Sequence, residues 1–183
     1  MPKLDAIQAK QVIVELLRAA GGAWTGKTKL YKAFYLAHLY YAENEPGYLT
    51  NWPVVRMPNG PGIDAGDELL EELELTGIIA RDAAMVGPYH TSSYRLTGKK
   101  LPAERLAKKA LEAIRVAVEF VQTKSATELS DLTHEFSRSW LNARDGQHLN
   151  IYIDLIEEDE FARREQSLET LHRDLVAAWT SDP

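Results

Sequence analysis

Residues 21 to 28 read GGAWTGKT, which matches G-x-x-x-x-G-K-S/T, the phosphate-binding loop of ATP- and GTP-hydrolysing proteins. That loop works because a buried strand delivers a glycine-rich turn to the start of a helix, whose free backbone N–H groups hold the anion. The partner motif is an apolar strand ending in an aspartate that holds Mg²⁺, and Asp154 in NIYID is the one match. The chain around Gly21 must supply that strand if the match is to carry nucleotide chemistry.

The pattern around the loop predicts helices instead of strands. Upstream, apolar and small residues recur in steps of three and four at Ala6, Ala9, Ile13, Leu16, Leu17 and Ala20. Downstream, a second such stripe consists of Leu30, Ala33, Phe34, Ala37, Tyr40 and Tyr41. We therefore expect helix–turn–helix, with Gly21 and Gly22 ending the first helix, and interpret the phosphate-loop match as accidental.

His134 is the side chain best suited by type to acid–base catalysis. Asp131, three residues earlier on the same helix face, could orient its imidazole. However, Ser137 and Ser139 lie in a polar run without a strained elbow, so no nucleophile is marked. His134, Glu135 and His148 lack the H-E-x-x-H spacing, and we expect no metal site. We expect His134 and Trp140 to pack a helix corner; contact with a partner and catalysis are the alternatives, in that order.

Bulk properties favour an ordinary globular protein. The 183 residues are 45% hydrophobic and 26% charged, with no cysteine and a formal net charge of −6. The absence of cysteine excludes disulfides, thiolate zinc sites and cysteine nucleophiles, and suits a reducing cytoplasm. We see no signal peptide and no run near the ~18 apolar residues of a membrane span. We therefore expect a cytoplasmic protein that needs no cofactor.

Periodicity and turn signals predict an α+β fold that is mainly α-helical. Expected helices cover about 5–20, 27–44, 65–76, 102–123, 126–134, 137–144 and 157–179. Asp64 is expected to cap the third helix, Pro102 to start the fourth, and Ser125 with Glu128 to form a capping box for the fifth. Two short strands are expected at 78–84 and 92–97. Residues 48–63 are expected to be irregular or briefly extended, with a turn at Gly60-Pro61-Gly62.

The helix before the expected hairpin gives the N-terminal half a winged-helix-like order. In a DNA reader that helix enters the major groove and needs basic or amide side chains. Here residues 64–76 hold only acidic charges, at Asp64, Asp67, Glu68, Glu71, Glu72 and Glu74. Basic residues gather instead at Arg95, Lys99, Lys100, Arg105, Lys108, Lys109 and Arg115. We interpret those as a solvated helix face, with a docking surface for phosphate or an acidic partner as the alternative.

Several segments, taken in order, resemble one known family. They are KTKLYKAFYLAHLYYAENEP, then PNGPGIDAGDELLEEL, then SATELSDLTHEFSRSWLNARDG followed by an Ile-rich stretch. This order is similar to the Panacea (SocA-like) antitoxin family, over roughly residues 5 to 155. The resemblance implies a domain over 1–156, with a winged-helix-like part at about 5–98 and a helical part at about 101–156. Residues 157–183 would add an amphipathic helix.

The resemblance also implies a function: an antitoxin that binds a cognate toxin and masks it, or delivers it to a protease or chaperone, without catalysis. Candidate partner-binding residues are Tyr31, Tyr35, Asn59, Gly60, Pro61, Glu68, Glu71, Glu72, His134 and Trp140. The aromatic residues of the second stripe are mostly core by their spacing, and Tyr31 and Tyr35, at its edge, are the two proposed as exposed interface anchors. The alternative function is a winged-helix DNA-binding regulator that uses the basic residues between 95 and 115, and a nucleotide-binding enzyme comes third.

Overall fold

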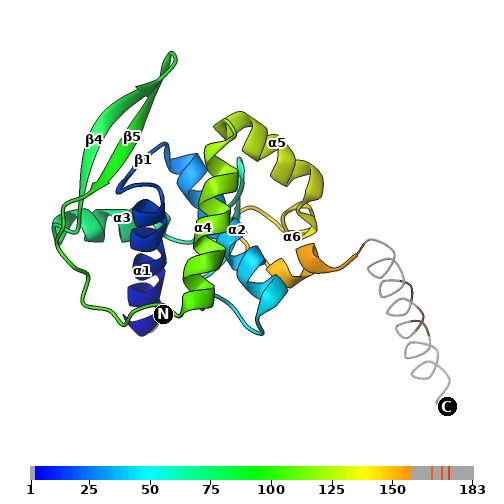
Figure 1. Ribbon diagram of the computed structural model, residues 1–183. Coiled ribbons are helices and arrows are strands. Elements are labelled where there is room, and N and C mark those ends of the chain that lie inside the picture. The colour runs from blue at the N-terminus through cyan, green and yellow to red at the C-terminus, as the bar shows by residue number, and fades with distance from the viewer. Residues whose placement is uncertain (1–2, 158–165, 167–169, 171–172, 174–183) are drawn as a thin grey trace.

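The computed structural model describes residues 3–157 together with residues 166, 170 and 173. Helix α2 lies at the centre, with α1 and α4 packed against it, and the β4–β5 hairpin projects from the body (Figure 1). The expected α+β class is confirmed. In chain order the elements are α1 (Lys3–Ala19), β1 (Ala23–Thr25), α2 (Lys27–Asn44), β2 (Val54–Met57), β3 (Gly60–Ile63), α3 (Gly66–Leu75), β4 (Ile79–Val86), β5 (Tyr89–Leu96), α4 (Lys108–Gln122), α5 (Ala126–Phe136), α6 (Arg138–Leu141) and the 3₁₀ helix η1 (Ile151–Leu155).

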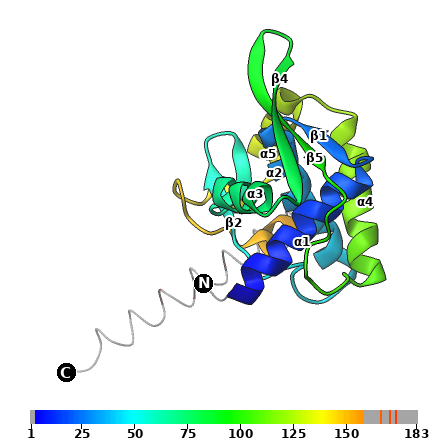
Figure 2. The same ribbon diagram turned by 90° about the vertical axis from the view of Figure 1, so that its left-hand side faces the viewer.

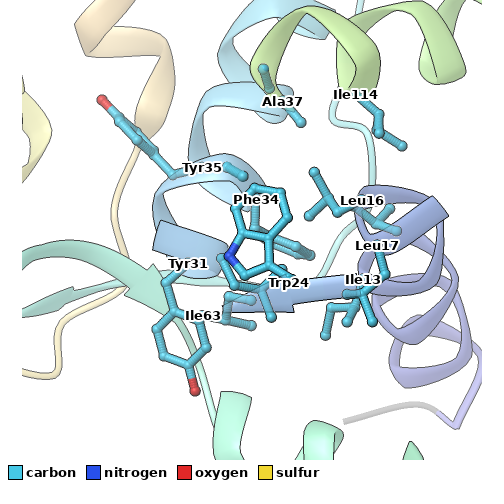
Figure 3. Packing of buried hydrophobic residues seen from close by; sticks show 14 of the residues in the cluster. Ile13, Leu16, Leu17, Trp24, Tyr31, Phe34, Tyr35, Ala37, Ile63 and Ile114 are labelled. Carbon is cyan, nitrogen blue, oxygen red and sulfur yellow. The ribbon is translucent and has the colours of Figure 1, made fainter. Parts of the chain in front are cut away.

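Helix α2 is buried on all sides over its middle part, and its predicted bounds of 27–44 are confirmed. Every residue from Leu30 to His38 is buried. A helix surrounded by other elements needs apolar residues all round, and this run supplies them except at Lys32 and His38. Phe34 packs between α1 side chains such as Leu16 and the neighbouring strands (Figure 3). The polar side chains of this helix are therefore enclosed by the fold.

The GGAWTGKT segment contains a short strand that the sequence did not predict. Helix α1 ends at Ala19, and Gly21 and Gly22 follow with positive φ of 85° and 92°, as a glycine stop requires. Strand β1 then pairs antiparallel with β5, and α2 begins at Lys27. The expected helix–turn–helix order is right for the two helices, but the turn between them includes this strand.

The strands form two antiparallel sheets, one in the order β1-β5-β4 and one of β2 with β3. The prediction that Gly60-Pro61-Gly62 forms the turn is wrong. The turn lies at Pro58 and Asn59, and the glycine-rich segment is strand β3, whose Gly60 pairs with Met57. Glycine there allows close packing, because β3 is fully buried, and Gly60 also ends the turn with a positive φ of 97°.

The prediction that Asp64 caps helix α3 is wrong. Its N-cap is Ala65, in the left-handed region at φ 45°, and no side chain caps the helix. The backbone of Asp64 is already engaged, since its N–H donates to Pro53 and its carbonyl accepts the Trp52 indole N–H at 2.7 Å. The predicted stop at Gly77 is confirmed, with φ 71°.

The hairpin and the later helices differ from prediction mainly at their ends. Strands β4 and β5 are longer than expected and meet at a tight turn of Gly87 and Pro88. Helix α4 begins at Lys108, so the prediction that Pro102 starts it is wrong. The capping box of α5 is confirmed, with Ser125 Oγ accepting from the Glu128 N–H and the Glu128 carboxylate accepting from the Ser125 N–H. Helix α6 is shorter than the expected 137–144.

One hydrophobic core joins the two expected halves of the domain. Ile114, Ala117, Val118 and Val121 of α4 belong to the same buried cluster as Ile13 of α1 and Phe34 of α2. The winged-helix arrangement and the domain boundary at 156 stay predictions. The helix expected over 157–179 lies outside the described residues, apart from isolated helical positions at 166, 170 and 173.

Candidate functional site

Lys32 lies where the motif segments of the sequence meet. Its ammonium group donates to the carbonyl of Asn59 and, at 3.3 Å, to that of Pro61, although Lys32 and Pro61 are far apart in the chain. Thr133 of α5 lies against Gly60, next to the Lys32 ammonium group. We call Lys32, Asn59, Gly60, Pro61 and Thr133 the motif junction. Three of its five members were candidates from the sequence, whereas Lys32 and Thr133 were not singled out.

The position of Gly60 in the motif junction leaves no room for a side chain. Its φ is +97°, which L side chains rarely adopt, and a Cβ built on it would lie 2.2 Å from Lys32 Nζ and 2.4 Å from Thr133 Oγ1. Thr133 cannot easily withdraw, because its hydroxyl donates to the carbonyls of Leu129 and Ser130, at 3.0 Å each. Glycine therefore allows α2, α5 and the β2–β3 hairpin to approach one another.

Burial makes Lys32 electrostatically unusual. Its side chain is 1% exposed, and no carboxylate pairs with it in the part of the chain that the structure describes. Desolvation lowers the pKa of Lys32 to about 7, because the charged amine has lost water. A pocket of about 220 Å³ lies beside it, lined also by Lys27, Tyr31 and Asp67. The ammonium is already used in holding the hairpin turn.

His134 and Trp140 pack against each other at the corner between α5 and α6, as predicted. Their rings are stacked, with centroids 4.2 Å apart and planes at 14°. The Trp140 indole N–H donates to the Met57 carbonyl at 2.8 Å, and the Arg56 guanidinium lies 4.1 Å from its ring. No hydrogen bond joins His134 to Asp131 within the described chain, so the base–orienter pair is not formed.

The carboxylate of Asp154 fastens η1 to the helices. It accepts from the Tyr35 hydroxyl at 2.7 Å, the Ser139 hydroxyl at 2.6 Å, the Ser139 N–H at 2.8 Å and the Ser137 hydroxyl at 3.2 Å. The expectation that Tyr35 is exposed is wrong, since it is 3% exposed. Burial and the Asp154 charge raise the pKa of Tyr35. Asp154 therefore serves in a structural hydrogen-bond cluster, and its match to a magnesium-binding aspartate is not needed to explain it.

Tyr31 is also internal, so the expectation that it is exposed is wrong. It is 6% exposed, and its hydroxyl donates to Asp67 at 3.2 Å. Figure 3 shows Tyr31 and Tyr35 pointing in different directions from α2. Burial alone would raise the pKa of Asp67, but the hydrogen bond and charge of Lys27, 2.8 Å away, hold that pKa below its usual range.

Three contacts explain why GGAWTGKT is not arranged as a phosphate loop. The Gly26 N–H donates to Ser92, and the Gly22 carbonyl accepts from Leu96, so the segment is committed to the sheet. Lys27 is committed to Asp67. A phosphate loop needs a free run of N–H groups and a free lysine, and this segment supplies neither.

Glu68, Glu71 and Glu72 lie on the exposed face of α3, away from its buried leucines. Glu72 accepts from Lys10 of α1 at 2.7 Å. These three carboxylates thus form a separate acidic surface, which we call the α3 acidic face. Among the residues that the structure describes, no three His, Asp or Glu side chains are grouped as a metal ion would need. None of the described helices combines the length and apolarity needed to cross a bilayer.

A signal in the sequence could have revealed Lys32. In LYKAFYLAH the lysine stands within a run that is apolar on all sides of a helix, which indicates a buried helix and hence a buried amine. Asp154 had no comparable signal, since its partners lie far away in the chain.

The chain was compared with known proteins and protein families. A family model described as "Antitoxin SocA-like, Panacea domain" matches residues 30–141. That stretch contains all five residues of the motif junction together with His134 and Trp140. No curated protein and no solved structure matches the chain.

Proposed function

The chain belongs to the SocA-like antitoxin family with a Panacea domain, and from this we propose that it neutralises a cognate toxin by binding it directly in the cytoplasm. The observation that carries the proposal is the family match over residues 30–141. We further propose that binding involves no catalysis by this chain. Masking the toxin and handing it to a protease or chaperone both begin with this binding step.

The geometry around Lys32, Asp154 and His134 supports binding over chemistry. Lys32 and Asp154 are each held by hydrogen bonds within the fold. His134 is stacked on Trp140 and lacks an orienting carboxylate in the described chain. A catalytic site needs a nucleophile or base within reach of a substrate, and these groups are occupied in positioning helices.

DNA binding is less well supported. Helix α3, which precedes the hairpin, carries five carboxylates and no lysine or arginine. Of the basic residues between 95 and 115, Arg95 lies 4.0 Å from Asp82, Lys109 pairs with Glu45, and Arg115 pairs with Glu112 and Glu119. Because these cations are partly neutralised by carboxylates, they attract the phosphates of a nucleic acid more weakly than the number of basic residues suggests.

Growth rescue tests the proposed function. The tagged chain is first used to capture its partner from nuclease-treated native lysate, and the partner is identified by mass spectrometry. We expect one stoichiometric protein that stops growth when expressed alone and no longer does so when this chain is co-expressed. A captured protein that is harmless alone, or toxicity that persists with the chain present, would refute the antitoxin function.

We propose that the α3 acidic face steers a basic surface of the toxin. Changing Glu68, Glu71 and Glu72 to lysine should slow association about tenfold or more at low salt, because long-range attraction becomes repulsion. The effect should shrink as salt is added, and stopped-flow kinetics would measure it. Reversal of Glu104, Asp131 and Glu135, which are also exposed, is the control with the same change in charge. Equal association rates for the two triple variants would contradict the proposal.

A further inference from the structure

Strand β5 has an open edge at its N-terminal end, near the hairpin tip. Strand β1 pairs with β5 only from Ala23, opposite Arg95, to Thr25, opposite Ser93. The chain then turns at Gly26 into α2. Beyond this point β5 has β4 on one side, and its other side is not covered by a strand of the described chain. Figures 1 and 2 show this far end of the hairpin projecting from the body.

The backbone groups at this edge can be assigned from the ladder. The Ser92 carbonyl accepts from Gly26, and the Leu96 N–H donates to Gly22, so even-numbered residues of β5 face the β1 side. Hydrogen bonding alternates along an antiparallel strand. The N–H and carbonyl of His90 therefore face the open side, whereas those of Thr91 face Ala84 of β4. An edge with such groups can pair with one more strand.

A groove runs along this edge, between the hairpin and the starts of α2 and α5. Its volume is about 660 Å³, which is enough for a short peptide segment. Its lining includes the cations Lys29 and Arg81, together with Lys27, whose ammonium already pairs with Asp67, and it includes no carboxylate. The start of α2 adds partial positive charge, since no side chain caps it. Near the hairpin tip the lining includes Val86 and Tyr89, which are 54% and 74% exposed.

We propose that an extended, acidic segment of the toxin binds in this groove and continues the sheet from where β1 leaves it, pairing with His90. The proposal depends on the proposed antitoxin function and names the surface it uses. An open strand edge selects an extended peptide backbone, and the cations of the lining select carboxylates. A second copy of this chain fits less well, because two such grooves would bring like charges together. The ribose-phosphate backbone of a nucleic acid lacks the alternating donors and acceptors of a strand.

Removing one backbone N–H tests the proposal. His90→Pro deletes the N–H that faces the open side, at an edge position where proline is tolerated. His90→Ala removes the side chain and keeps the N–H. With the captured toxin, titration calorimetry should show affinity at least about tenfold weaker for His90→Pro and nearly unchanged for His90→Ala. Circular dichroism of each variant reports folding.

Amide exchange measured by NMR on the unaltered chain tests the same proposal without a mutation. The His90 amide should exchange fast in the free chain and slowly in the toxin complex, whereas the Thr91 amide, bonded within the hairpin, should be slow in both.

Other results would overturn the proposal. The groove is refuted, and the antitoxin function left intact, if the wild-type chain rescues growth but His90→Pro binds the toxin with unaltered affinity. The same conclusion follows if the His90 amide still exchanges fast in the complex. Failure of the wild-type chain to neutralise any toxin refutes both. Sedimentation showing a toxin-free dimer that His90→Pro dissolves would assign the edge to a second copy. Binding of a fluorescein-labelled oligonucleotide that Lys29→Gln abolishes would assign it to nucleic acid.

Discussion

Replacing Gly60 by alanine is expected to lower the free energy of unfolding by about 3–5 kcal/mol, the largest effect we expect from any single methyl group in this chain. Backbone strain at φ +97° contributes part of the loss. The added Cβ contributes the rest, since it would lie 2.2 Å from Lys32 Nζ and 2.4 Å from Thr133 Oγ1 in a buried site. Urea denaturation followed by fluorescence of the four tryptophans would measure the change.

Gly47 separates the two contributions to the Gly60 effect. It has the same φ of +97°, but nothing lies within 4 Å of the position of its Cβ. Gly47→Ala should therefore show the strain alone, about 1–2 kcal/mol. If Gly60→Ala costs no more than Gly47→Ala, the close approach of Lys32 and Thr133 does not limit this position.

Lys32→Met is expected to change how stability depends on pH. The pKa of Lys32 is about 7 in the folded chain, against 10.5 for a fully hydrated lysine side chain, which represents the unfolded chain. Between these values the unfolded chain binds more protons, so the free energy of unfolding should rise with pH. Below about pH 7 both states are protonated, and the burial penalty is present in full. Methionine has no amine to titrate and should abolish this part of the rise.

The stability difference between wild type and Lys32→Met should therefore shift in favour of wild type by about 3 kcal/mol from about pH 6 to about pH 9.5. Measurements should stop there, because buried Tyr31 and Tyr35 have raised pKa values and stability is lost when tyrosines ionise in the unfolded chain. Lys100→Met, at an exposed position, controls for the loss of one charge. Parallel curves for wild type and Lys32→Met would show that Lys32 stays charged in the folded chain.

These two predictions assign the motif junction a role in the fold. Lys32 holds the turn before β3, Gly60 leaves room for it, and Thr133 brings α5 against both. A family can retain such a motif because it keeps the domain in shape, while the partner is recognised elsewhere. In our proposals the recognition falls on exposed surfaces, namely the α3 acidic face and the groove at the open edge of β5.

Elements specified by local interactions were the ones predicted well. Helix α2 has a long apolar run, and α5 has its capping box written in Ser125 and Glu128. The errors lie where distant contacts override local preference. Asp64 is a good N-cap residue by type, but its backbone is held by Trp52 and Pro53. Pro102 suits a helix start, yet α4 begins at Lys108, and Leu101 and Leu106 pack on the core outside the helix.

The sequence by itself determined the α+β class, the centres of the helices, the packing of His134 on Trp140 and the family. Periodicity and capping are properties of neighbouring residues, and a motif order can be recognised without coordinates. Only the tertiary structure decided that Tyr31 and Tyr35 are internal, that Lys32 reaches Asn59 and Pro61, and that β1 leaves an edge of β5 open. Each of these depends on which distant segment lies opposite, and the pattern of one segment does not specify the segment that packs against it.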